Sequence, residues 1–475
     1  MRITISFFMI FILMLVSCKK TEIANPERDI VQIGKLSVDK QVFINRYRLS
    51  KDFAKDKQIT RDDVVKFLDE YFVKNYLLVN KLLDQGIENE KEIKEDLERL
   101  KRRAMTGMNG PLYRKVIPSS VEVSDQEIED LYNKSNYMLK IAYLRVSSKH
   151  LADSLYKALK KGADFGEIAK KYSLDIHTYE HGGEVRNYIQ RGSLDPEFEK
   201  AIFNLKEGQV SKPIYITGWY NIVKVLKKKP IQKKPLEQMR PQLKQRLQQF
   251  KMNEIRNNYI DSLFIKYDYR VNKELFPYIK KAFVPFDRVG QLKVDAIPKD
   301  KLKEPLVTYK GGQFTLLEFV KTYNSSNAAS RVPLRYDDEI ENHIKTLIIG
   351  HLMYADAVAR GLLEDEQFKF IYNRMRIQKL EREALKRLVN EQIKLTDEEL
   401  KKYYEQHKQE WNNQDFEKVK RFVRNRLMAQ RAKEYKNQLT EKLRKEYDVV
   451  YNEPVIKEVV DSLNAMKKGP HIRKF

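Results

Sequence analysis

The chain contains two copies of one sequence pattern, and this repeat constrains its fold more than any other feature. Five stretches of the first copy have a counterpart in the second. They are 34–47 with 312–323, the helical pattern that ends at Gly86 with the one that ends at Gly361, 123–132 with 395–404, 236–247 with 416–427, and 267–268 with 447–448. The offset is 272 residues at Asp125 and Asp397 but only 180 at the later pairs, so 92 residues of the first copy are missing from the second. One module therefore occurs twice, and only its first copy carries an inserted domain.

The inserted stretch differs from its surroundings because apolar and polar residues alternate in it, whereas the flanking sequence has helical spacing. The expected elements are strands over 137–146, 213–217 and 220–226, and helices over 151–161, 165–172 and from Pro196 to Gly208. They predict a compact βααβ-like unit. Outside it, capping pairs such as Ser124 with Glu127 open amphipathic helices.

These patterns predict an α+β chain that is mostly helical, with a duplicated helical module and one inserted α/β domain. The expected organisation is a signal peptide at 1–17, a tether at 18–30, a first helical module from 31–136 and 232–276, the inserted domain at 137–231, a linker at 277–304 and a second helical module at 305–475.

The first seventeen residues have the pattern of a secretory signal. Arg2 precedes an apolar run from Phe7 to Val16, too short to span a bilayer because a spanning helix needs roughly 20 residues. The run ends in a Leu-Val-Ser-Cys sequence that resembles the bacterial lipobox, so we expect cleavage before Cys18 and lipid attachment to its thiol. A signal peptide with an incidental cysteine is the alternative. Cys18 is the only cysteine, so no disulfide is available.

The formal net charge of +24 points to acidic partners. Export argues against nucleic acid, which leaves anionic membrane surfaces and acidic or unfolded client chains, while solvated lysine faces would give the same count. Lys19 and Lys20 follow Cys18 in place of an acidic run. We therefore expect the periplasmic face of a bacterial membrane, the outer membrane in particular.

The inserted stretch resembles a parvulin-type (PpiC) peptidyl-prolyl isomerase domain. The resemblance covers about 137–230 and includes the helical sequence up to Asp175, the pair Gly182-Gly183, the stretch 191–215 and the strand Trp219 to Val225. The arrangement of such a domain between helical segments that pair with each other is similar to that of the SurA and PrsA class of extracytoplasmic foldases. This resemblance implies a chaperone role for the helical modules.

The resemblance also implies a site. Family members use two histidines on neighbouring strands, an adjacent acid or thiol, and a methionine and phenylalanine that line a proline pocket. Tyr143 and Asn221 occupy the two histidine positions, Asp175 the acidic one, Leu194 that of the methionine and Phe198 that of the phenylalanine. The apolar pocket is therefore expected without either imidazole.

Two other kinds of site, a metal site and a nucleophilic triad, lack the sequence features that they need. His177 and His181 have a metal-ligand spacing if helical but lie before a Gly-Gly turn, and Ser173, Asp175 and His177 lack the nucleophile elbow of a triad. The sequence has no phosphate-cradling glycine motif, paired zinc cysteines or dinucleotide fingerprint, so no cofactor and no metal are expected.

The sequence thus predicts a membrane-anchored periplasmic chaperone of the parvulin class that binds unfolded or outer-membrane client proteins. An active peptidyl-prolyl isomerase working through Asp175 is one alternative. An accessory lipoprotein subunit of an outer-membrane protein assembly machine is the other.

Overall fold

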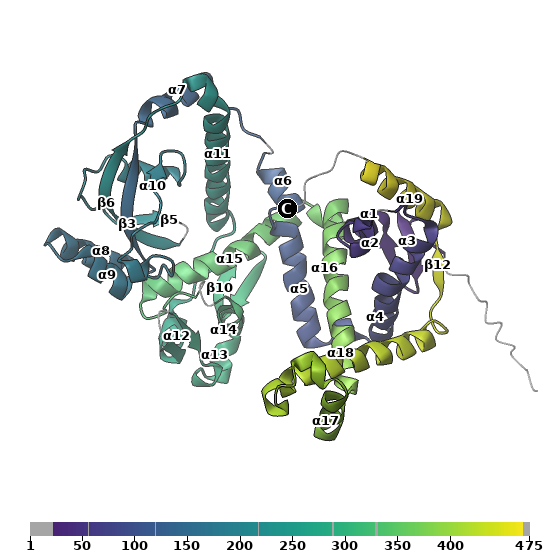
Figure 1. The fold of residues 1–475 in the computed structure, drawn as a ribbon. Coiled ribbons are helices and arrows are strands. Elements are labelled where there is room, and N and C mark those ends of the chain that lie inside the picture. Colours follow the sequence, from purple (N-terminus) through teal and green to yellow (C-terminus); the bar gives the residue numbers. More distant parts are fainter. Residues whose placement is uncertain are drawn as a thin grey trace, which may run out of the picture. The chain divides into compact units, whose positions relative to one another are not determined.

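The computed structural model describes residues 22–55, 57–118, 120–216, 218–286, 289–327 and 331–468. The predicted signal peptide and Cys18 lie outside these residues. The fold is α+β and mostly helical, as expected (Figure 1). None of the described helices combines the length and the apolar character that a membrane-crossing segment needs.

The chain forms two compact units. One combines the N-terminal segment up to Glu98 with the segment from Asn373 onward, and the other is continuous from Arg99 to Tyr372.

The first unit places the two ends of the chain in one fold. Its elements are β1 (Asp29–Ile33), β2 (Leu36–Asp39), α1 (Lys40–Arg48), α2 (Lys51–Ala54), α3 (Arg61–Leu68), a π-helical turn (Asp69–Val73), α4 (Lys74–Asp84), the start of α5 (Lys91–Thr106), most of α16 (Glu366–Ala384), α17 (Asp397–Gln406), α18 (Phe416–Leu443), β12 (Val449–Tyr451) and α19 (Glu453–Lys468). The sheet order is β12-β1-β2 and all pairs are antiparallel. Figure 1 shows the yellow β12 and α19 beside the purple N-terminal helices.

The second unit contains the inserted domain and the beginning of the second copy. Its elements after α5 are α6 (Pro111–Val116), α7 (Asp125–Lys134), β3 (Tyr137–Val146), α8 (Lys149–Lys160), α9 (Phe165–Tyr172), β4 (Ile189–Gln190), α10 (Pro196–Ile202), β5 (Ile214–Ile216), β6 (Trp219–Pro230), α11 (Leu236–Lys266), β7 (Arg270–Val271), α12 (Phe276–Ala282), β8 (Phe283–Phe286), β9 (Val289–Leu292), α13 (Lys299–Lys303), β10 (Pro305–Tyr309), β11 (Gly312–Thr315), α14 (Leu316–Ser325) and α15 (Asp337–Ala359).

The two copies exchange their C-terminal segments. Hairpin β10–β11 of the second copy pairs with β7 of the first, whereas hairpin β1–β2 of the first copy pairs with β12 of the second. The backbone N–H of Asn272 donates to Leu306, and the N–H of Asn452 donates to Ile30 in the same way. Because the corresponding segments have similar sequences, each hairpin accepts the other copy's strand with equivalent hydrogen bonds.

This exchange corrects the expected grouping of 31–136 with 232–276. Residues 31–98 pack instead with 373–468, and the strand after α11 belongs with the hairpin at 305–315. The part of this grouping that the structure keeps is the contact of α7 with α11 beside the insertion, through Ile128, Leu131 and Leu243. The segment 277–304, expected as a linker, contains α12, the hairpin β8–β9 and α13, because its apolar residues pack into the core of the second unit.

The inserted domain has the expected helices and strands, except that α10 ends at Ile202 rather than near Gly208 and that the short strand β4 was not expected. Its sheet has the order β4-β3-β6-β5, and all its strands are antiparallel. Side chains alternate between the two faces of β3. Leu144 and its neighbours pack against α8 and α9 on one face, whereas Ile141 and Val223 pack against α10 on the other.

Candidate functional site

The predicted site residues lie on the face of the sheet that α10 covers. Tyr143 stands opposite Val223 in the register of β3 and β6, and Arg145 stands opposite Asn221. Since alternate residues of a strand share a face, these side chains form one surface with Ile141.

The apolar part of the site is formed by Leu194 and Phe198. Both are partly buried and pack, with Tyr143, on the core that contains Ile141 and Val223. The structure therefore brings the predicted pocket residues together with the tyrosine at the first histidine position.

Glu199 fixes the loop that carries Leu194. Its buried carboxylate accepts the backbone N–H groups of Gly192 at 2.7 Å, Ser193 at 2.8 Å and Leu194 at 3.0 Å. Burial raises the pKa of Glu199, and these three hydrogen bonds oppose the shift. The sequence analysis did not identify this residue, although its place one position after Phe198 in α10 aims it at the preceding loop.

Asp175 is almost fully buried and is held from several sides. The Thr178 hydroxyl donates to its Oδ2 at 2.6 Å, and the Arg145 guanidinium lies 3.8 Å from its Oδ1. Burial and a hydrogen bond with Asp175 raise the pKa of Tyr143 to about 12, so the phenol keeps its proton at neutral pH. Tyr143 is therefore a neutral hydrogen-bond donor beside this carboxylate.

The segment before Asp175 is fastened to strand β3. The Ser173 hydroxyl accepts the backbone N–H of Arg145 at 3.2 Å and that of Asp175 at 3.3 Å, while the N–H of Leu174 donates to the Arg145 carbonyl at 2.8 Å. Ser173 is thus a buried hydrogen-bond acceptor that holds this backbone in place.

Arg145 is a central residue that the sequence analysis missed. Its Nε donates to Oδ1 of Asn221 at 3.3 Å, and its guanidinium carbon lies 5.7 Å from the ring centres of both Tyr143 and Trp219. It links the acid, the tyrosine and the asparagine in one network. Its position two residues after Tyr143 in an alternating strand was the signal that could have revealed it.

Asn221 is largely used by the sheet itself. It is buried, and its Nδ2 donates to the carbonyls of Ile214 and Trp219, each at 3.4 Å. The second histidine position therefore holds an amide that connects β6 to its edge strand β5.

The Gly-Gly turn lies directly against the site strand. Gly183 has φ +83°, and an added Cβ would stand 2.3 Å from the Tyr143 carbonyl oxygen. The Gly183 carbonyl in turn accepts the Tyr143 N–H at 2.9 Å. His177 and His181 precede this turn, and no group of three or more metal-ligating side chains occurs among the described residues.

Comparison with known proteins agrees with this architecture. Residues 140–227 match the family model of the PPIC-type PPIASE domain, or rotamase. The chain is 30% identical over 204 residues to the foldase protein PrsA of Geobacillus sp. (strain WCH70), covering 42% of this chain and 72% of that protein. It is 28% identical over 207 residues to a parvulin-like PPIase of Rickettsia typhi, covering 40% of this chain and 72% of that protein.

Among solved structures, the peptidylprolyl isomerase PrsA of Bacillus anthracis aligns with 23% identity and a TM-score of 0.24, covering 47% of this chain and 94% of that one. The sequence matches extend beyond the inserted domain into the helical segments around it. The chain belongs to the family of parvulin-type peptidyl-prolyl isomerases that includes the foldase protein PrsA.

Proposed function

We propose that this protein is a lipid-anchored periplasmic chaperone of the parvulin class that binds unfolded or outer-membrane client proteins and isomerises prolyl bonds slowly at best. The observation that supports this best is the combination of an apolar pocket at Leu194 and Phe198 with a polar side that has no imidazole.

The physical argument concerns the transition state of the prolyl bond. Rotation meets a barrier of about 18–20 kcal/mol because the planar amide is stabilised by resonance. Lowering it requires groups that favour the twisted amide. Here Asn221 is engaged with strand carbonyls, and Asp175 is already bonded to Thr178. The polar side is therefore committed to internal contacts, whereas the apolar pocket can still bind a side chain or a proline ring.

The test compares catalysis with client holding in the same protein. One assay follows the cis-to-trans relaxation of a short Xaa-Pro peptide, and the other follows suppression of aggregation of an unfolded outer-membrane barrel protein. We expect catalysis near background, with client holding weakened about five- to thirtyfold by Phe198→Ala, since losing a ring contact costs about 1–2 kcal/mol.

Phe422→Ala is the matched control, because it removes the same ring from an exposed position on α18. Equal losses in both variants, or no loss in either, would contradict a specific role of the pocket.

An active isomerase is the second candidate, and the Tyr143 hydroxyl beside Asp175 favours it. A neutral phenol can donate a hydrogen bond where family members have a histidine. Catalysis at the level of active parvulins that is abolished by both Asp175→Ala and Tyr143→Phe would establish this candidate in place of the first.

The proposed location and partners rest on Cys18 and on the charge of the chain. Attachment to the periplasmic face of the outer membrane would place the pocket among newly exported proteins. A native pull-down separates this from an accessory subunit of an outer-membrane assembly machine: many unfolded barrel proteins would support the chaperone, and one stoichiometric partner the subunit.

A further inference from the structure

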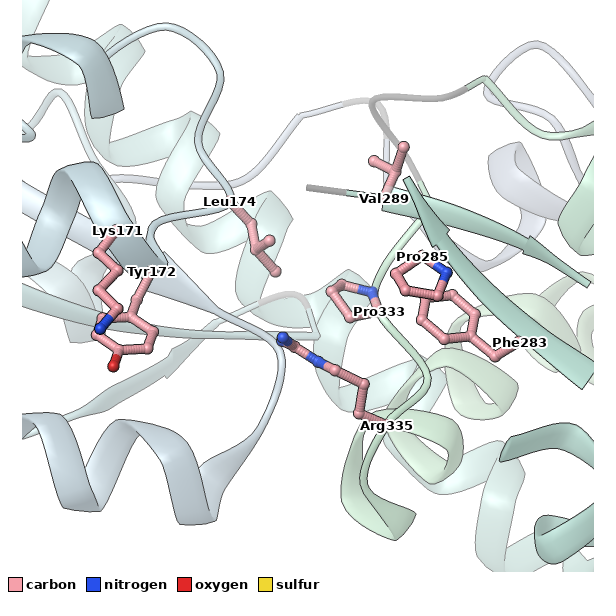
Figure 2. A pocket seen from close by; sticks show the side chains of 8 residues that line it. All are labelled: Lys171, Tyr172, Leu174, Phe283, Pro285, Val289, Pro333 and Arg335. Atoms are coloured by element: carbon pink, nitrogen blue, oxygen red, sulfur yellow. The ribbon is translucent and has the colours of Figure 1, made fainter. Parts of the chain in front are cut away.

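A groove of about 220 Å³ lies beside the parvulin-like site, within the second unit (Figure 2). One wall comes from Lys171 and Tyr172 at the end of α9 and from Leu174, two residues beyond that helix. The other comes from the hairpin β8–β9 and the segment before α15. That second wall consists of Phe283, Pro285, Val289, Pro333 and Arg335.

The composition of the groove defines the chemistry of its occupant. Among the residues that the structure describes, six of the eight that line the groove are apolar or aromatic, the other two are Lys171 and Arg335, and none is a carboxylate. In Figure 2 the guanidinium of Arg335 extends toward the wall that carries Lys171 and Tyr172. Ligand pockets for small molecules usually measure about 300–1,000 Å³, so this smaller volume fits one large side chain better than a whole cofactor.

Both cations can still bind an anion. The Arg335 side chain is half exposed, and its guanidinium is 3.5 Å from the buried Glu339. Lys171 is exposed, with its Nζ 5.1 Å from the centre of the Tyr172 ring, and no carboxylate pairs with it among the residues that the structure describes. An incoming carboxylate would therefore find two donors beside an apolar surface.

The inserted domain, which carries the first wall, is bonded to the start of α15, which directly follows the second wall. The Ser147 hydroxyl donates to Glu339 at 2.8 Å, and Asp338 accepts the Ser148 hydroxyl at 2.9 Å and the Lys149 N–H at 2.6 Å. The groove is thus preformed, which lowers the entropic cost of binding. Leu174 in its wall directly precedes Asp175 of the parvulin-like site, so one extended client could contact both.

We propose that this groove binds an extended client segment that presents a large apolar side chain next to an acidic residue. The proposal rests on the chaperone function and adds a second client site with a stated preference.

The probes are two proline-free peptides that carry p-benzoyl-phenylalanine followed by either glutamate or lysine. With the full chain, we expect photo-crosslinks at Tyr172, Leu174 and Phe283, and binding about two- to fivefold tighter for the acidic peptide, as one or two exposed ion pairs provide. Lys171→Glu should reverse this preference. Lys160→Glu, the same charge change at an exposed position of α8, should leave it unchanged.

Three results would overturn the proposal: equal binding of the two peptides, an unchanged preference in Lys171→Glu, or crosslinks confined to Leu194 and Phe198. The peptides contain no proline and the crosslinks report position. A failed groove therefore remains distinguishable from a failed chaperone function, which Phe198→Ala tests with a whole client protein.

Discussion

Glu339→Ala should lower the unfolding free energy of the second unit far more than a substitution that only removes a helix cap. Glu339 is fully buried, accepts the Ser147 hydroxyl and the backbone N–H groups of Arg335 and Tyr336, and thereby joins α15 to the inserted domain. Leaving the buried Ser147 hydroxyl without its acceptor costs about 1–3 kcal/mol, and losing the cap costs about 0.5–2 kcal/mol. We expect a net loss of about 2–3 kcal/mol, since removing a buried carboxylate also removes its desolvation cost.

Glu318→Ala supplies the control. Glu318 caps α14 in the same unit through Thr315 but is exposed and bonds no other segment within the described part of the chain, so its loss should cost about 1 kcal/mol. Urea unfolding is followed by the fluorescence of Trp219, which packs on the core of this unit, in a Trp411→Phe background that removes the only other tryptophan. Equal destabilisation by the two variants would refute the argument that the Ser147 contact matters.

The buried carboxylate of Glu339 also makes the stability of the second unit depend on pH. Burial raises the pKa of Glu339 above its ordinary 4.5, so the folded protein binds a proton more readily than the unfolded chain. The unfolding free energy therefore falls as the pH rises from about 4.5 through the folded pKa. Glu339→Gln keeps an acceptor for the backbone and a donor for Ser147 but cannot titrate, so this component should be absent from its stability profile. A profile identical to the wild type would contradict the assignment.

Three further outcomes are expected. Cys18→Ala should release the protein from membranes as soluble or unprocessed chain, and mature protein that stays bound on fractionation would contradict lipid attachment. The fragment 99–372 should fold alone with a cooperative thermal transition, because this unit is continuous in sequence; a molten fragment by near-ultraviolet circular dichroism would speak against it. Glu199→Ala should cost about 1–3 kcal/mol in urea unfolding by leaving the Gly192 and Leu194 N–H groups without acceptors, and a change below 0.5 kcal/mol (about half the smallest expected value) would be inconsistent with that role.

The elements of the inserted domain could be predicted because each has a strong local signal. Alternation along 137–146 gave strand β3 with its bounds, and the Asp195 N-cap with proline at the next position gave the start of α10. The placement of Tyr143, Leu194 and Phe198 on one face followed from matching a whole family pattern in order. Arg145 was not predicted as a site residue because the family pattern assigns no role to its position. Only the alternation of β3 could have placed it in the site.

The exchange between the two copies could not be read from the repeat. A repeat identifies which segments are equivalent, but it does not decide which copy supplies each partner. Hairpins β1–β2 and β10–β11 can each accept β7 or β12, since the strands resemble one another and are followed by Asn272 and Asn452, which make the same backbone hydrogen bond. The strand sequences and this hydrogen bond therefore do not distinguish the two arrangements, and the connections between the strands have to be considered. The first copy's hairpin is separated from β7 by the whole inserted domain, whereas β7 precedes β10 by only a short α/β segment. Closing the shorter loop costs less chain entropy, although the dependence is weak. Pairing β7 with the hairpin that follows it leaves β12 to join the hairpin at the start of the chain, and this is the arrangement that the structure has.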